Sequence, residues 1–151
     1  IANRYRAYNT RIRESGEGHD PLYEGIADLV TQLSADGWLL GVATGKAMRG
    51  LQYVLATHGI AHHFVTLQTA DLHPSKPHPS MIEAALMETG AERAESVVMG
   101  DTSSDMAMAQ AAGVRGLGVG WGYHPPAELL AAGAASVAMD SAELGRHIRL
   151  P

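Results

Sequence analysis

Short apolar runs alternate along the chain with segments whose apolar residues recur every three or four positions. The apolar residues of 26–33 have helical spacing and predict a helix that ends near Gly37. The run WLLGVAT that follows predicts a buried strand at 38–44. Further strands are expected at 64–69, 96–100, 114–122 and 136–140. Further helices are expected at 46–58, 80–89, 104–112, 126–132 and 142–147.

Regular alternation of strands and helices predicts an α/β fold with a doubly wound, mostly parallel sheet. Ligands of such sheets bind outside the carboxyl ends of the strands, so the polar residues that follow each strand are the ones to weigh. The chain begins differently: Ile1, Tyr5, Tyr8 and Ile12 have the spacing of one helix face. The polar, glycine-rich stretch 15–21 then predicts a linker.

Composition narrows the class of partner. Apolar residues make up 46% of the 151 residues and the formal net charge is −5, with the basic residues scattered. No basic stripe is available for nucleic acid, and no apolar run approaches the length of a membrane span, so neither partner is expected. The absence of cysteine excludes disulfides and thiolate metal sites and fits a cytoplasmic location.

Two carboxylates flank the turn after the predicted strand 96–100. Asp101 comes where the strand ends, and Asp105 falls in the first turn of the next helix, so both can share one side of the turn. Mg²⁺ prefers oxygen ligands, and one or two carboxylates with substrate phosphate suffice to bind it. The alternative is that Asp101 only ends the strand while Asp105 interacts with the helix dipole.

Two other strand ends carry groups suited to an anion. Thr44 and Gly45 offer a hydroxyl and backbone N–H groups before a helix, although an isolated threonine there more often only caps the helix. Lys76 lies in the proline-stiffened segment SKPHP, although a lone lysine is usually only solvated. The spacing of the eight histidines does not favour metal ligation, since Gly59 separates His58 from His62.

Taken in order, the strand–TGK, KPHP and strand–GDTSSD–helix–AAG segments resemble the haloacid dehalogenase-like hydrolase superfamily, especially its phosphoglycolate-phosphatase-like branch. The resemblance covers about residues 22–148, and GDTSSDMAMAQAAG is its most specific part. It implies a Rossmann-like core domain over 21–151. Residues 1–20 would then be the remnant of a helical cap and its linker.

The resemblance also implies a function, namely Mg²⁺-dependent hydrolysis of a small phosphorylated metabolite through an aspartyl-phosphate intermediate. Thr44 and Gly45 would bind the phosphoryl oxygens. Lys76 would neutralise the phosphoryl group and orient the nucleophile. Asp101 would bind the metal, and Asp105 would support it through water or hydrogen bonds.

The chain departs from the family pattern in one respect. The DxDGT-like motif that carries the nucleophilic aspartate does not occur in it, so we expect the first strand of the core and its nucleophile to be missing. Two alternatives stay open beside the phosphatase. One is a phosphomutase of the same superfamily, and the other is a non-catalytic relative that retains the anion site.

The 151 residues alone are therefore expected to have no phosphatase activity. In the family the first strand lies between the strands that end at Thr44 and Asp101, and its loss leaves backbone groups unpaired at about 1–3 kcal/mol each. We expect these inner strands to pair with an upstream N-terminal segment, with each other or with another chain. The assay is complementation with a peptide that carries the upstream strand and its aspartate. Robust Mg²⁺-dependent phosphate release without the peptide would contradict the expectation.

Overall fold

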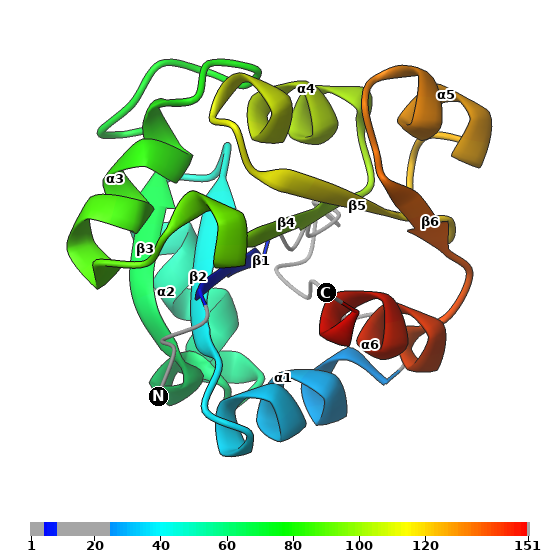
Figure 1. Ribbon diagram of the computed structural model, residues 1–151. Coiled ribbons are helices and arrows are strands. Elements are labelled where there is room, and N and C mark those ends of the chain that lie inside the picture. Colours follow the sequence, from blue (N-terminus) through cyan, green and yellow to red (C-terminus); the bar gives the residue numbers. More distant parts are fainter. Residues whose placement is uncertain (1–4, 9–24, 151) are drawn as a thin grey trace.

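A computed structural model describes residues 5–8 and 25–150 of the chain and contains one six-stranded parallel sheet (Figure 1). The strands run in the order β3-β2-β1-β4-β5-β6 across it. Their bounds are β1 Tyr5–Tyr8, β2 Leu39–Thr44, β3 Phe64–Thr69, β4 Val97–Gly100, β5 Arg115–Val119 and β6 Ser136–Ala138. The predicted doubly wound α/β fold is thus confirmed, and all five strands predicted from residue 38 onwards are present.

Helices cover both faces of the sheet. Helices α1, α2 and α6 lie on one face and α3, α4 and α5 on the other (Figure 1). Their bounds are α1 Ile26–Ala35, α2 Met48–Thr57, α3 Ser80–Thr89, α4 Ser103–Ala111, α5 Pro126–Ala131 and α6 Ser141–Arg149. Two short 3₁₀ helices, Ala61–His63 and Arg93–Glu95, were not predicted. The first directly precedes β3, and one residue separates the second from β4.

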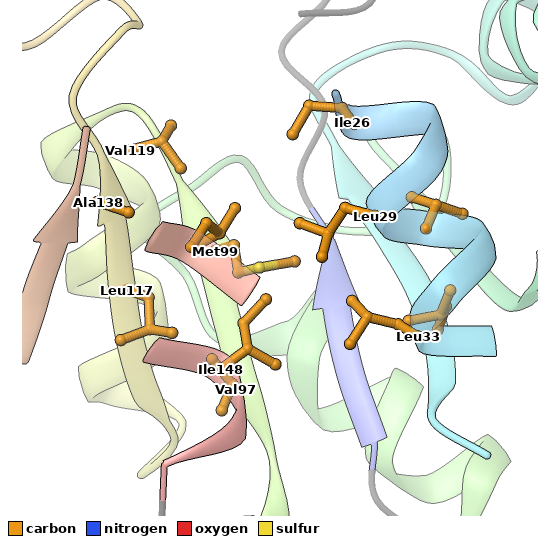
Figure 2. Close-up of a cluster of buried hydrophobic side chains, with 12 residues drawn as sticks. Ile26, Leu29, Leu33, Val97, Met99, Leu117, Val119, Ala138 and Ile148 are labelled. Atoms are coloured by element: carbon orange, nitrogen blue, oxygen red, sulfur yellow. The ribbon is translucent and has the colours of Figure 1, made fainter. Parts of the chain in front are cut away.

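The core lies on both faces of the sheet because the central strands are buried on both sides. On the α1–α6 face, Leu29 and Leu33 of α1 pack with Ile148 of α6 over Val97 and Met99 of β4 (Figure 2). On the other face, α3 and α4 pack over Val98, the residue between those two. Alternate residues of one strand therefore supply both cores, which is why parallel strands show nearly continuous apolar runs.

The helix predicted for residues 1–15 is wrong at residues 5–8, which form the central strand β1. Tyr5 to Tyr8 pair in parallel with Leu39 to Val42 of β2, and Arg6 to Tyr8 pair with Val97 to Met99 of β4. Backbone hydrogen bonds to a neighbouring strand on each side stabilise β1, and they outweigh the helical spacing of the apolar residues in this segment. Tyrosine also favours strands. The other residues of that predicted helix and the linker 15–21 lie outside the described residues.

Strand β1 lies in the position that the sequence led us to expect vacant. Strands β2 and β4 therefore do not close on each other, and that alternative is wrong. Pairing of this sheet with an upstream segment or with another chain stays a prediction. Residues 5–8 belong to the core sheet, so the assignment to a cap remnant stays a prediction only for the rest of 1–20. Within 5–8 and 25–150, no helix is long and apolar enough to cross a membrane.

Candidate functional site

The turn between β4 and α4 places two carboxylates at the carboxyl edge of the sheet. Thr102 caps α4: its Oγ1 accepts a hydrogen bond from the Asp105 N–H at 3.2 Å. In return, Asp105 Oδ2 accepts from the Thr102 N–H at 3.2 Å and from the Thr102 hydroxyl at 2.9 Å. This reciprocal capping box satisfies donors that a helix start leaves open. Asp105 therefore lies in the first turn of α4, as predicted.

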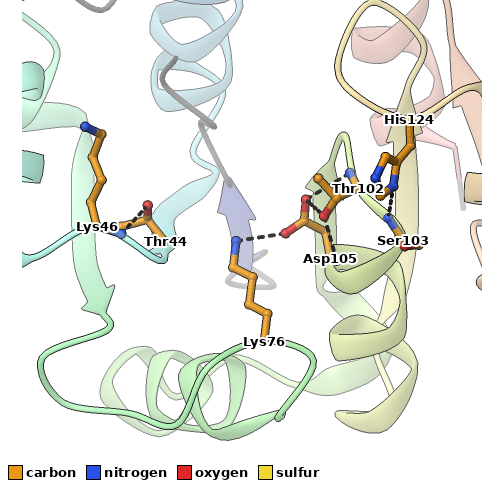
Figure 3. Close-up of polar contacts among 7 residues, drawn as sticks. All are labelled: Thr44, Lys46, Lys76, Thr102, Ser103, Asp105 and His124. Carbon is orange, nitrogen blue, oxygen red and sulfur yellow. Dashed lines mark hydrogen bonds and ion pairs between the residues drawn. The ribbon is translucent and has the colours of Figure 1, made fainter. Parts of the chain in front are cut away.

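The second oxygen of Asp105 joins this turn to the loop after β3. Lys76 Nζ lies 2.8 Å from Asp105 Oδ1 (Figure 3). The side chain of Asp105 is 1% exposed and that of Lys76 is 15% exposed, so the ion pair is largely shielded from water. A methyl group at Gly100 would lie 2.5 Å from Asp105 Oδ2. The absence of a side chain at residue 100 therefore allows the carboxylate to pack against the end of β4.

Asp101 is held by the loop that follows β5. Its carboxylate Oδ2 accepts from the Tyr123 N–H at 3.1 Å, and its carbonyl accepts from the His124 N–H at 3.1 Å. His124 Nδ1 in turn accepts from the Ser103 N–H at 2.8 Å (Figure 3). Because Nδ1 accepts that hydrogen, its 3.7 Å approach to Glu128 Oε2 is not an ion pair. Three hydrogen bonds thus join the two loops around Asp101.

Thr44 ends β2 and is buried, and its hydroxyl accepts from the Lys46 N–H at 3.2 Å (Figure 3). Helix α2 begins at Met48, two residues later than predicted, and the Met48 N–H donates to Asp71 Oδ2 at 2.7 Å. The first N–H of the helix is thus bound by Asp71, while the sequence suggested the Gly45 N–H for an anion. The Thr44 hydroxyl hydrogen is the remaining donor of that side chain.

The predicted site residues therefore gather at one edge of the sheet from three loops. Lys76 and Asp105 are in direct contact, and Asp101 begins the turn that carries Asp105. Thr44 and the exposed Gly45 lie on the other side of β1 from that turn (Figure 3). An ammonium, a hydroxyl and two carboxylates at one edge match the needs of a phosphoryl group with a bound cation.

Comparison with known proteins identifies the family of the chain. The family model described as haloacid dehalogenase-like hydrolase matches residues 1–119. The chain belongs to that family. Phosphoglycolate phosphatase of Haemophilus influenzae (strain 86-028NP) is 33% identical over 104 residues, which are 68% of this chain and 46% of that protein. "Probable phosphatase IndB" of Dickeya dadantii (strain 3937) is 34% identical over 131 residues, which are 84% of this chain and 56% of that protein.

The fold of this haloacid dehalogenase-like hydrolase agrees with solved structures. A hydrolase from Pseudomonas syringae superposes with a TM-score of 0.76 at 26% identity, over 84% of this chain and 58% of that one. The chain spans about half the length of the curated relatives it matches. The homologues are phosphatases by name, so hydrolase activity is a property of the family.

A divalent cation such as Mg²⁺ fits the residues around Asp101. That carboxylate is 2% exposed, it begins the turn at the sheet edge, and it is a hard oxygen donor. Both oxygens of Asp105 already accept hydrogen bonds, which favours the supporting role expected for it. Within the described part of the chain, no three His, Cys, Asp or Glu residues group to hold a metal. Mg²⁺ commonly uses few protein ligands and completes its shell with water and phosphate.

Two adjacent histidines, His62 and His63, lie at the amino edge of the sheet, opposite the site. His62 and His63 belong to the 3₁₀ helix before β3, with ring centroids 3.9 Å apart, so they precede a strand that carries the site at its far end. Burial, and to a smaller degree the neighbouring His62, lower the pKa of His63. Sequence reasoning missed Asp71, which acts through a contact with a distant segment.

Gly122 is the residue whose replacement tests the hold on Asp101. A methyl group there would lie 2.6 Å from Asp101 Oδ2, so Gly122→Ala must displace the carboxylate or the loop. We expect overpacking to lower the free energy of unfolding by about 1–3 kcal/mol. Gly50→Ala is the control, because a methyl group meets nothing within 4 Å there and alanine favours the helix. Urea denaturation measures both, and equal midpoints would contradict the close packing.

Proposed function

We propose that this haloacid dehalogenase-like hydrolase cleaves phosphate monoesters of small metabolites in a Mg²⁺-dependent reaction, with a substrate class like that of phosphoglycolate phosphatase. The observation that carries the proposal is the shielded Lys76–Asp105 ion pair beside Asp101 at the carboxyl edge of the sheet. Sheets of this type bind ligands at that edge. A cationic group fixed there by a buried carboxylate is suited to a phosphoryl oxygen.

Lys76 and Thr44 would act on the charge that develops on the phosphoryl oxygens. The ammonium of Lys76 has three hydrogens, one of which faces Asp105 Oδ1, so others remain for the substrate. The Thr44 hydroxyl accepts from Lys46 and retains its hydrogen for donation, and the Gly45 N–H would assist it. Donors preset in this way stabilise the transition state without reorganising during the reaction.

Asp101 would hold the metal, and Asp105 would keep Lys76 and the turn in place. When bound, Mg²⁺ supplies positive charge that neutralises the phosphoryl oxygens and orients the ester for in-line attack. The Tyr123 N–H already donates to one oxygen of Asp101 and fixes its direction. The carboxylate of Asp101 is thus oriented before the metal binds, so less side-chain entropy is lost on binding.

The proposed reaction proceeds through an aspartyl phosphate. A carboxylate oxygen attacks phosphorus, the ester P–O bond breaks, and the leaving alkoxide takes a proton from a general acid. Water then gives a proton back to that group and attacks phosphorus, which releases inorganic phosphate and regenerates the carboxylate. No DxDGT-like sequence occurs among the 151 residues, so the nucleophile would come from outside them. A cytoplasmic location also stays a prediction.

Lys76→Ala and Thr44→Ala test the anion-binding groups. In the natural protein each is expected to lower turnover of a phosphate monoester roughly a hundredfold, the usual loss when one preset donor is removed. Arg146→Ala removes an exposed charge on α6 and serves as the control. Thermal unfolding shows whether each variant is folded, because Lys76→Ala also leaves Asp105 without its cation. Activity within twofold of the parent for both variants would refute the assignment.

Asp101→Asn tests the metal assignment. The amide keeps the shape and the oxygen that Tyr123 contacts but removes the negative charge, so the Mg²⁺ concentration for half-maximal activity is expected to rise at least about tenfold. Asp28→Asn removes an exposed carboxylate in the first turn of α1 and should leave the titration unchanged. Superimposable Mg²⁺ titrations for Asp101→Asn and the parent would remove Asp101 from the metal site.

A further inference from the structure

The function proposed above assigns no role to a polar network beneath the Lys76 loop. Thr66 and Gln68 are each 3% exposed although they are polar, and they lie two residues apart on β3, so both face α3. Gln68 Nε2 donates to Glu88 Oε2 at the end of α3 and to Thr66 Oγ1 at 2.8 Å. Thr66 Oγ1 also donates to Glu88 Oε2, at 3.3 Å.

The network continues from Gln68 through His73 to Ser80. His73 Nε2 lies 2.7 Å from Gln68 Oε1, and His73 Nδ1 lies 2.6 Å from Ser80 Oγ. Ser80 is the first residue of α3. One imidazole ring thus connects the strand before the loop with the helix after it.

The exposed carboxylate of Glu88 determines the direction of every bond in this series. An ionised carboxylate only accepts hydrogen bonds, so it selects the amide nitrogen of Gln68. The amide oxygen of Gln68 is then turned towards His73, and the ring must carry its hydrogen on Nε2. Nδ1 of the neutral ring is left to accept from the Ser80 hydroxyl. Each donor in the series therefore meets an acceptor.

The hydrogen bond of the His73 ring to Ser80 connects the two ends of the six-residue span 74–79, and Lys76 lies in this span. The span holds Pro74, Pro77 and Pro79, and its backbone turns through a bond from the His78 N–H to the Ser75 carbonyl at 3.1 Å. From there Lys76 extends to Asp105, 29 residues away along the chain. Fixing both ends of so short and proline-rich a span restricts where the ammonium can lie.

We propose that His73 is a positioning residue for Lys76, and that the series Glu88–Gln68–His73–Ser80 holds the loop so that Nζ stays at Asp105. The consequence for catalysis rests on the proposed function; the consequence for Lys76 itself does not. A displacement of about 1 Å in a group that acts on the transition state can cost a hundredfold in rate. A network of this kind therefore affects turnover without contact with the substrate.

The first test reads Lys76 directly, without any substrate. Lysine residues occur only at positions 46 and 76, so acylation by an amine reagent, followed by peptide mass spectrometry, yields the ratio of labelling at Lys76 to labelling at Lys46. His73→Ala removes both bonds of the ring and is expected to raise this ratio roughly five- to tenfold. His78→Ala is the matched control in the same loop, because its Nδ1 accepts only the nearby Ser80 N–H, at 3.1 Å, among the described contacts of that ring. Its ratio should stay within about twofold of the parent, since no connection to β3 is lost.

A pair of substitutions keeps the test independent of folding. Gln68→Glu alone places a second carboxylate beside Glu88 and should raise the labelling ratio as His73→Ala does. Gln68→Glu combined with Glu88→Gln keeps an acceptor for His73 Nε2 and restores a donor between positions 68 and 88. The double variant should return to the parent ratio. Thermal unfolding identifies any variant that is not folded, so a raised ratio in a folded variant reports the position of Lys76 and not a loss of the fold.

Steady-state kinetics form the second readout. His73→Ala is expected to lower kcat roughly tenfold or more while KM changes by less than about threefold, because the ammonium matters most in the transition state. Absence of phosphatase activity in the natural protein that contains these residues and the nucleophile would refute the proposed function and leave the labelling test intact. Equal labelling ratios for His73→Ala, His78→Ala and the parent would overturn the positioning role.

Discussion

The buried carboxylate of Asp105 is the interaction on which the rest of the site depends. A charge with 1% exposure is stable only when donors surround it, and here three hydrogens from Lys76 and Thr102 do so. Two of them belong to the turn before α4, and the third comes from the loop after β3. Because one carboxylate accepts hydrogen bonds from both segments, it fixes them relative to each other. The start of α4 and the ammonium of Lys76 are therefore held in a fixed relative position.

Space at the sheet edge is the second constraint, and two glycines provide it. Gly100 lets the Asp105 carboxylate pack against the end of β4, and Gly122 lets the loop after β5 approach Asp101. Backbone N–H groups of that loop then reach the carboxylate and carbonyl of Asp101 directly. Protein interiors are packed closely enough that a single methyl group at either position would alter this geometry. The parallel sheet brings these strand ends together, and the glycines set how closely they pack.

The loops outside the strand ends follow the same logic on a smaller scale. Asp71 caps α2 from the segment after β3, and His124 binds the N–H of Ser103 from the segment after β5. His73 connects β3 to α3 below Lys76. Phosphoryl transfer demands mainly position and charge from the protein. In the proposed function, short polar contacts between neighbouring loops would meet that demand.

The sequence alone determined what depends on neighbouring residues. Periodicity located β3 and α3 to the residue, glycines marked the helix ends, and the spacing of Asp101 and Asp105 placed both at one strand-to-helix turn. Strand–helix alternation also predicted the sheet and its ligand-binding edge. Only the tertiary structure decided that residues 5–8 form the central strand, that Lys76 pairs with Asp105, and that His73 joins Gln68 to Ser80. Ladder bonds and side-chain contacts of this kind join segments far apart in the chain, and no local spacing records them.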